Sequence, residues 1–266
     1  GDTFTLNTVS SNTGYGINTD AGDSFTGNTV TGNGGFGIDT DSGNTFTGNT
    51  VSENGSWGIN TDAGDTFDSN TIENNTSYGI NTDTGNTFTD NIVSGNGSYG
   101  INTDAGDTFN QNTIEDNNGY GINTDSGTAF TGNVISGNGG YGLNISPGDS
   151  SIVLSGNTFE SNTDNGLQAF ITTDISLIGE VFTANQNNGI EIDGSSVVSI
   201  STLNISGDAT LNYGGSTPDG NNENGLRIVN LGSFNITDSS SILNNYASGI
   251  YLENTSIIDI SSNTFS

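Results

Sequence analysis

The first half of the chain repeats every 21 residues, and this period constrains the fold more than any other feature. Three apolar columns keep that spacing. The first column is aromatic and consists of Phe4, Phe25, Phe46, Phe67, Phe88, Phe109 and Phe130. The second is β-branched and consists of Val9, Val30, Val51, Ile72, Val93, Ile114 and Ile135. The third is aliphatic and consists of Ile17, Ile38, Ile59, Ile80, Ile101, Ile122 and Leu143.

Three apolar columns per period predict three short strands per coil, with one column facing the core from each of three sheets. Gly and Asn turns separate the strands, and strands this short cannot pair as hairpins at a fixed period. Parallel, in-register stacking of coils satisfies both the backbone hydrogen bonds and the apolar columns. The sequence therefore predicts an all-β fold, a single-stranded parallel β-helix (β-solenoid) with 21-residue coils.

After residue 147 the period loosens. The third column continues at Leu167, Ile190, Leu226 and Ile250, with gaps of 24, 23, 36 and 24 residues. Eleven members of this column predict about eleven coils. We expect residues 1–147 to form a regular β-helix and residues 148–266 to continue it with longer, irregular coils. The widest gap is rich in Gly and Asn and predicts a loop at 207–224. Both ends lie within the repeat, so we expect flanking segments or stacking on other subunits.

Asparagine forms two further columns at turns. One contains Asn7, Asn28, Asn49, Asn70, Asn91, Asn112 and Asn133. The other contains Asn12, Asn33, Asn54, Asn75, Asn96, Asn117 and Asn138. Stacked Asn amides can hydrogen-bond along the axis, and Asn tolerates the left-handed turn conformation, so we predict a structural role for both columns. A 42-residue period overlays the first, because Asp23, Asn44, Asp65, Asn86 and Asp107 alternate.

The charge excludes several classes of partner. The chain has 30 acidic residues, one basic residue, no His and a formal charge of −29. Nothing can neutralise phosphates, so we expect no nucleic-acid partner. No apolar run of about 18 residues occurs, so we expect no direct membrane insertion. Cys is absent, which excludes disulfides and thiolate metal sites.

The segment 43–59, GNTFTGNTVSENGSWGI, resembles the parallel β-helix repeat superfamily of pectate-lyase-like and NosD-like right-handed β-helices. The resemblance covers nearly the whole chain and implies a right-handed coil. That superfamily includes pectate-lyase-like enzymes, alginate epimerases, phage tailspikes and surface proteins, so it implies a fold rather than one activity. Pectate-lyase-like enzymes use a basic residue with Ca²⁺-binding carboxylates, and alginate epimerases use a His-containing site. This chain has neither Lys nor His.

Acidic columns suggest a metal site. One aspartate column stacks coil on coil, and a second set of aspartates lies one tight turn away. The first consists of Asp20, Asp41, Asp62, Asp83, Asp104 and Asp125, and the second includes Asp23, Asp65 and Asp107. Oxygen ligands on a Gly turn suit Ca²⁺, which is our candidate cofactor. The alternative is a solvated acidic edge, or Asp side chains that cap turn amides.

A fourth column is aromatic and lies two residues before the inward Ile. It consists of Tyr15, Phe36, Trp57, Tyr78, Tyr99, Tyr120 and Tyr141. Later coils carry Asn165, Asn188 and Asn224 in this position, which favours a partly exposed corner over a buried slot. We expect a corner stack of rings. It serves packing alone, or it contacts glycans or another protomer.

Candidate catalytic carboxylates should interrupt the repeat at one place, because a repeated acid is a member of a column. The acidic residues of the irregular region are Asp164, Asp174, Glu180, Glu191, Asp193, Asp208, Asp219 and Glu223. Arg227 occupies the outward position one coil beyond Glu191, and we predict an ion pair between them. Outward Thr pairs such as Thr45 and Thr47 resemble ice-binding arrays, but Asp68 and Asn110 interrupt them.

Repetition accounts for most polar residues, and the sequence identifies no catalytic residue. The main prediction is a non-catalytic extracellular or cell-surface β-solenoid with a structural or adhesive role. It would be a stalk, fibre or filament subunit that self-associates or binds surface glycans. The alternative is a polysaccharide lyase or hydrolase of the pectate-lyase-like fold, and the second alternative is an ice-binding protein.

Overall fold

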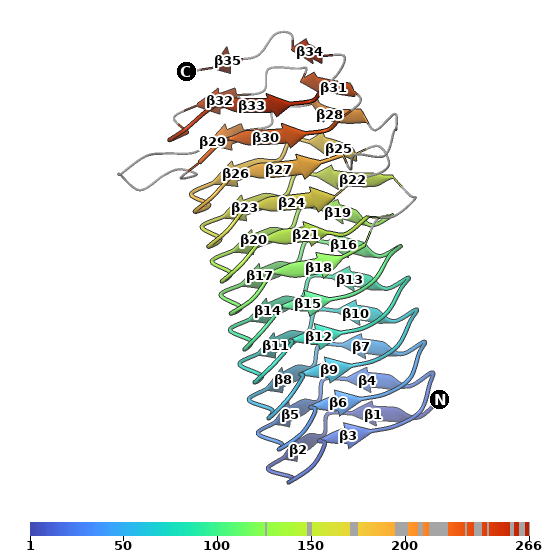
Figure 1. Cartoon of the computed structure of the whole chain (residues 1–266). Helices are drawn as coiled ribbons and strands as arrows, with labels where there is room; N and C mark the ends of the chain where they lie inside the picture. The colour runs from blue at the N-terminus through green and yellow to red at the C-terminus, as the bar shows by residue number, and fades with distance from the viewer. Residues whose placement is uncertain are drawn as a thin grey trace.

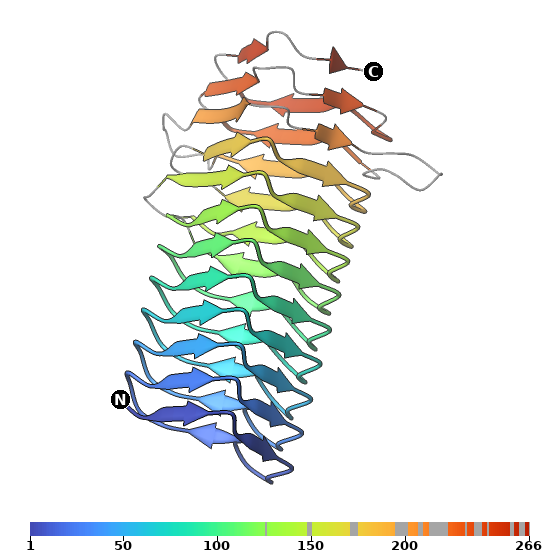
Figure 2. The ribbon, with the colours of Figure 1, turned by 180° about the vertical axis from the view of Figure 1, so that it is seen from behind.

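The computed structural model describes all residues except 126, 148–150, 171–174, 195–201, 207–209, 213–222, 232, 237–240, 244, 256–257, 261–263 and 266. The chain winds into a rod in which three parallel sheets run along the axis (Figure 1). The N-terminus lies at one end of the rod and the C-terminus at the other, and the view from behind shows the same stacking (Figure 2). The predicted parallel β-helix is confirmed.

Each coil contributes one strand to each sheet. Sheet A consists of β1 (Thr3–Thr5), β4 (Ser24–Thr26), β7 (Thr45–Thr47), β10 (Thr66–Asp68), β13 (Thr87–Thr89), β16 (Thr108–Asn110), β19 (Ala129–Thr131), β22 (Ile152–Ser155), β25 (Ile175–Ile178), β28 (Thr202–Ser206), β31 (Ser233–Ile236) and β34 (Ile258–Ile260). Sheet B consists of β2 (Thr8–Ser10), β5 (Thr29–Thr31), β8 (Thr50–Ser52), β11 (Thr71–Glu73), β14 (Ile92–Ser94), β17 (Thr113–Glu115), β20 (Val134–Ser136), β23 (Thr158–Glu160), β26 (Val181–Thr183), β29 (Thr210–Asn212), β32 (Ser241–Leu243) and β35 (Thr264–Phe265). Sheet C consists of β3 (Ile17–Asn18), β6 (Ile38–Asp39), β9 (Ile59–Asn60), β12 (Ile80–Asn81), β15 (Ile101–Asn102), β18 (Ile122–Thr124), β21 (Leu143–Ile145), β24 (Leu167–Phe170), β27 (Ile190–Asp193), β30 (Leu226–Val229) and β33 (Ile250–Glu253).

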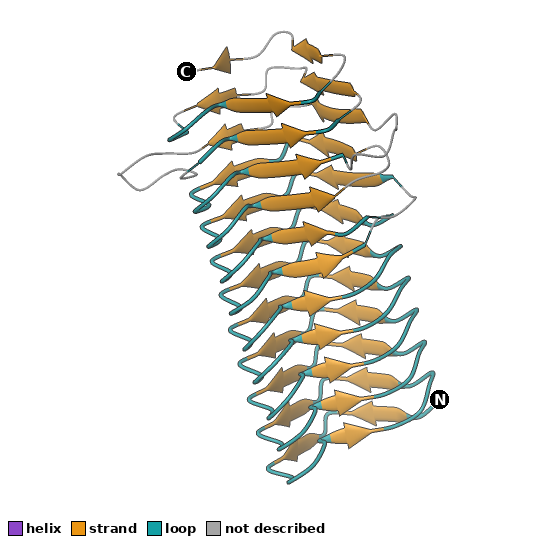
Figure 3. Ribbon diagram, viewed as in Figure 1, coloured by secondary structure: helices purple, strands orange, loops and turns teal. Residues whose placement is uncertain are grey.

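Strands and loops make up the whole of the described chain (Figure 3). Sheet C has 11 strands and sheets A and B have 12 each, in agreement with the predicted coil number. Among the described residues, no helix has the length and apolarity needed to cross a membrane.

The core is built from the three predicted columns. Neighbouring coils pair in register, so that Phe46 meets Phe25 and Phe67 in sheet A. The Phe rings from Phe4 to Phe130 stack face to face, with centroids 4.5–5.0 Å apart and interplanar angles of 4–10°. Burial of each such side chain contributes about 1.5–3 kcal/mol, so the thin core gains its stability by repetition.

The irregular half keeps the same register with different side chains. Leu154 and Leu177 replace Phe in sheet A, while Phe159 and Phe182 take over the ring stack in sheet B at 4.7 Å. Its sheet C strands are longer than in the first coils. Ile190 and Ile192 are fully buried, and the residue between them, Glu191, faces outward as predicted.

The two Asn columns form buried hydrogen-bonded ladders. Asn70 illustrates the pattern: its backbone N and its Nδ2 donate to Oδ1 of Asn91 at 3.0 and 2.9 Å. Its Nδ2 also donates to the carbonyl of Phe46 at 2.9 Å, while its own Oδ1 accepts from Asn49. Each amide therefore satisfies turn backbone groups of neighbouring coils, and the structural interpretation of these columns is confirmed.

The predicted loop at 207–224 is wrong in part. Within it, β29 (Thr210–Asn212) pairs with β26 and β32, so the winding continues through the segment. Leu211 pairs in register with Phe182 and Ile242, so it continues the sequence column of sheet B. Residues 207–209 and 213–222 lie outside the described residues. The loop was predicted from the gap in the sheet C column alone. That gap gives no information about sheet B, to which this strand belongs.

Replacement of Asn70 by Ala should lower the free energy of unfolding by about 2–4 kcal/mol, because buried donors on Asn49 and an acceptor on Asn91 lose their partner. Asn110→Ala is the matched control, since Asn110 is partly exposed on sheet A and should cost about 0.5 kcal/mol or less. Urea denaturation of both variants measures the difference. Equal destabilisation by the two variants would contradict the ladder's role.

Candidate functional site

The outer face of sheet C carries one polar side chain per coil. In the regular half these form a surface amide ladder in which each Nδ2 donates toward the N-terminal end, as from Asn102 to Asn81 at 2.9 Å. The ladder ends at Asp39, whose two carboxylate oxygens accept from Asn60 and Asn18, both at 2.7 Å. After Asn144 the same column changes character and consists of Gln168, Glu191, Arg227 and Tyr251.

The aromatic column lies at the corner beside this face. Successive rings from Tyr15 to Tyr141 have centroids 4.6–5.6 Å apart, and most are partly exposed. Because the rings cover one another's faces, mainly their edges reach solvent. Tyr141 is the last ring, tilted by 31° against Tyr120, and its far side carries no further ring of the column.

Beyond Tyr141 the corner position belongs to asparagines that form their own ladder. The backbone N of Asn188 donates to Oδ1 of Asn165 at 2.8 Å, and that of Asn224 donates to Oδ1 of Asn188 at 3.1 Å. Asn165 and Asn188 are only 2% exposed, so the expectation of an exposed corner is wrong for these coils. A buried slot accepts them because their amides are bonded to one another.

Glu191 is the centre of this irregular surface. Its Oε1 accepts from the guanidinium of Arg227, which confirms the predicted ion pair. Its Oε2 accepts from Nδ2 of Asn165 at 3.2 Å and from Nδ2 of Asn188 at 3.1 Å. The guanidinium of Arg227 also lies 5.6 Å from the centre of the Tyr251 ring. The carboxylate is therefore held in one orientation by donors from three coils.

A second carboxylate lies close by. Oδ1 of Asp164 accepts from Nδ2 of Asn187 at 2.5 Å and from the backbone N of Asn165 at 3.0 Å. The pKa of Tyr141 is raised by burial first, and then by the negative charges of Asp164 and Glu191 and by Tyr120. The two carboxylates are joined by Asn165, whose backbone N donates to Asp164 and whose Nδ2 donates to Glu191.

We call this group the Glu191 cluster, defined as Tyr141, Asp164, Asn165, Asn188, Glu191 and Arg227. It combines two carboxylates, a phenol, a guanidinium and two amides at the point where the repeat breaks. Since the chain contains no His or Lys, proton transfer here falls to carboxyl and phenol groups. The sequence named Asp164 and Glu191 as candidates. It gave no sign that Tyr141 and the corner asparagines would join them.

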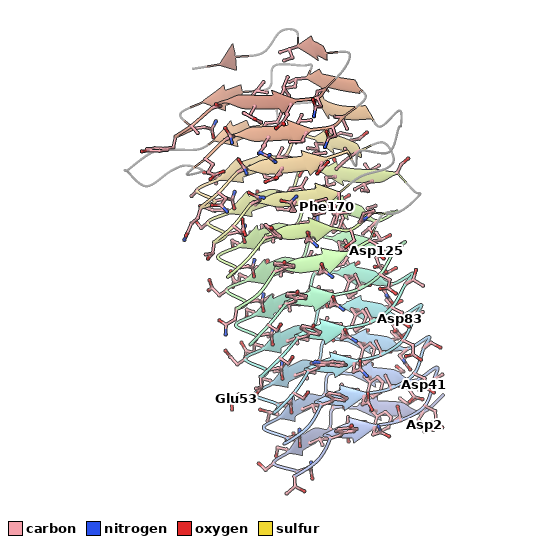
Figure 4. All side chains as sticks on the ribbon, in the orientation of Figure 1. Asp2, Asp41, Glu53, Asp83, Asp125 and Phe170 are labelled. Atoms are coloured by element: carbon pink, nitrogen blue, oxygen red, sulfur yellow. The ribbon has the colours of Figure 1, made fainter. Side chains whose placement is uncertain are left out.

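The two aspartate sets predicted to bind calcium differ in burial. Asp41, Asp83 and Asp125 lie along the edge where sheet C turns into sheet A (Figure 4). Asp23, Asp65 and Asp107 are instead buried, with at most 4% exposure. In the described part of the chain, no three acidic side chains are grouped as a metal site would need. Calcium binding stays a prediction, which melting with and without a chelator tests.

The buried aspartates belong to an alternating ladder. The backbone N and Nδ2 of Asn44 donate to Oδ1 of Asp65 at 2.6 and 3.1 Å, and Thr61 donates to its Oδ2 at 2.8 Å. Burial raises the pKa of Asp65, and it raises the pKa of Asp107 to about 6. A carboxylate cannot donate to a second carboxylate, so an amide separates them. This explains the 42-residue period.

Glu180, another acidic candidate, lies in the core rather than on a surface. It ends one of the buried Asn ladders, where its Oε2 accepts from the backbone N of Asn157 at 2.9 Å. Its Oε1 has no hydrogen-bond partner among the described residues. Burial raises the pKa of Glu180 to about 8. Of the other candidates, Asp193 accepts from Asn230, and Asp174, Asp208 and Asp219 lie outside the described residues.

The family model of the right-handed β-helix region matches residues 1–130 and 122–218. The chain therefore belongs to the right-handed β-helix family, and the predicted handedness is confirmed. Among curated proteins, no sequence matches the chain.

Solved structures with a similar fold include the periplasmic alginate epimerase AlgG, with a TM-score of 0.57 and 13% identity over 92% of this chain and 69% of that one. The A-module of the Azotobacter vinelandii mannuronan C-5 epimerase AlgE6 has a TM-score of 0.57 and 15% identity, covering 92% and 65%. The AlgE4 A-module from the same organism has a TM-score of 0.52 and 14% identity, covering 99% and 88%. At this identity the likeness shows the fold.

These comparisons correct the main functional prediction. The expected non-catalytic structural or adhesive role is wrong, because the matched structures are epimerases that act on a polysaccharide. The physical reason for the error is local. Repetition explains the columns of the regular half, but it does not explain the Glu191 cluster, which resembles a site more than a ladder.

Glu180→Gln should remove part of the pH dependence of stability. The folded chain keeps a proton on Glu180 that the unfolded chain releases between its usual pKa of 4.5 and the folded value of about 8. Stability therefore falls as pH rises through this window. Glutamine mimics the protonated acid, so the variant should gain on the order of 2–4 kcal/mol at pH ~8 and little at pH ~4.

Melting temperatures across this pH range measure the effect. Glu160→Gln is the control, since Glu160 is exposed on sheet B of the preceding coil. If Glu180→Gln raises the melting temperature equally at low and at high pH, burial of the charge is not the cause of the stabilisation.

Proposed function

We propose that the chain binds and processes a polysaccharide at the Glu191 cluster, as a lyase or a hydrolase. The observation that carries this proposal is that Asn165 joins two carboxylates at the break in the repeat, since its backbone N donates to Asp164 at 3.0 Å and its Nδ2 donates to Glu191 at 3.2 Å. Both reactions need groups that move protons at a fixed place, and two carboxyl groups are sufficient for glycoside hydrolysis. The hydrogen bonds around both carboxylates fix their orientation in advance, as catalysis requires.

The surface toward the N-terminus suits an extended glycan. The amide ladder of sheet C offers a donor or acceptor on each coil, and Asn side chains match sugar hydroxyls in both roles. The aromatic column runs alongside it and ends at Tyr141, beside the carboxylates. A ring that lacks a neighbour on one side can contact the apolar face of a sugar. We therefore place the glycan along the rod axis, with its reacting bond at the cluster.

We also place this activity outside the cytoplasm. The similar fold of the periplasmic epimerase AlgG supports that location. The acidic surface suits it as well, because a charge of −29 keeps a protein soluble without a partner of opposite sign.

Asp164→Asn and Glu191→Gln should each reduce turnover of a polysaccharide substrate by at least about 10²-fold, because each removes a proton-transfer group and keeps its shape. Release of reducing ends and of unsaturated products, from a panel of plant, algal and bacterial polysaccharides, measures this. Glu160→Gln is the matched control and should retain full activity, since Glu160 is exposed on sheet B, in the same coil as Asp164 but on a different sheet from Glu191. The proposal would be overturned if the chain neither binds nor turns over any polysaccharide of the panel. Unchanged turnover in both variants would also overturn it.

A further inference from the structure

The charge at the Glu191 cluster restricts its substrate. Arg227 is the single Lys or Arg in the sequence, and its guanidinium is already paired with Glu191. The cluster therefore has no cation left for a charged sugar.

A uronate or sulfate on the glycan would meet these carboxylates directly. It would have to displace Glu191 from Arg227 or lie beside Asp164 without a counter-ion. Both alternatives leave one carboxylate uncompensated next to a partly buried surface, which is unfavourable. The chain has 30 acidic residues, and those outside the cluster add long-range repulsion along the rod, which salt screens beyond about 8 Å at physiological ionic strength.

The polar groups instead match a neutral sugar. The surface amide ladder of sheet C is partly exposed and presents neutral donors and acceptors, and carboxylates accept from hydroxyl groups. None of these contacts requires a charge on the ligand. The preference for a neutral sugar thus follows from the pairing of Arg227 with Glu191 and from the neutral ladder beside it.

We infer that the Glu191 cluster takes an uncharged polysaccharide and hydrolyses its glycosidic bonds. This inference rests on the proposed function and chooses between its two reactions. β-Elimination removes a proton next to a sugar carboxyl group, which a neutral sugar lacks. Hydrolysis needs no such group: one of the two side chains, in its carboxylic acid form, donates its proton to the leaving oxygen as the C1–O bond breaks. The other takes a proton from water as its oxygen bonds to C1, and exchange with solvent restores both groups.

The first experiment compares polymer classes on the full chain. Neutral glucans, mannans and xylans of several linkages are tested beside polymannuronate, polygalacturonate and chitosan, each with calcium and with a chelator. We expect at least one neutral polymer to bind and to release reducing ends, without unsaturated products. Its binding should change little with salt, since no ion pair forms.

The outcomes separate the two proposals. Binding of no polymer of any class would overturn the proposed function itself. Binding or cleavage of a polyuronate as strong as that of any neutral polymer, in either calcium condition, would overturn the inference and leave the proposed function standing. Cleavage of chitosan alone would also overturn it, since the ligand would then be cationic.

A second experiment tests the role of the ion pair. Glu191→Gln removes the counter-ion of Arg227 and should strengthen binding of oligomannuronate by about tenfold, while it abolishes hydrolysis of the neutral substrate. Glu160→Gln makes the same change in net charge on sheet B and should leave both properties unaltered. Equal gains in oligomannuronate binding in the two variants would show that net charge, rather than the occupied Arg227, sets the preference.

Discussion

Parallel in-register stacking places every side chain directly above and below its counterparts in the next coils, and the remaining features follow from this constraint. Apolar groups gain from it, as the Phe stack shows. Among polar groups, only one that both donates and accepts can stack without limit, which is why Asn fills the two long interior ladders. Acceptor-only groups need a donor on each side. Asp65 and Asp107 are therefore separated by Asn86, and Glu180 stands at the end of a ladder with a raised pKa.

The same constraint explains how much of the fold the sequence predicts. A fixed period specifies which residues are neighbours, so the three sheets, the Asn ladders and the pair of Arg227 with Glu191 could all be predicted from spacing. The period does not specify which way a side chain points at a corner. Asp20 and Asp23 look alike in the sequence, yet Asp20 is exposed at the turn and Asp23 is directed inward. For the same reason, burial of Asn165 and Asn188 could not be predicted, because it depends on their mutual hydrogen bonds.

The candidate site was harder to predict than the fold because its residues are departures from columns. Each one looks unremarkable alone: Asp164 is one of 30 acidic residues, and Asn188 is one of many asparagines. Their significance depends on convergence across coils that are 23–36 residues apart in sequence. Assigning each residue to its own column explains the regular half of the chain correctly. The same approach misses the few positions at which the residue types of neighbouring columns change together.

Those simultaneous changes follow the same requirement as the interior ladders, that a group which only accepts hydrogen bonds needs donors in the neighbouring coils. On the outer face of sheet C, the acceptor Asp39 lies between two donors, Asn18 and Asn60. Glu191 is a second acceptor in that column, and its donors are Arg227 on the following coil and the two corner asparagines. The aromatic corner could not have supplied those donors, so replacement of the rings by Asn and the appearance of Glu191 belong to one change. Arg227 completes it, which gives the single basic side chain of an otherwise acidic protein a physical reason to be where it is. A solenoid can therefore acquire a reactive carboxylate on its surface only with compensating donors in adjacent coils, and the site is recognisable by that compensation.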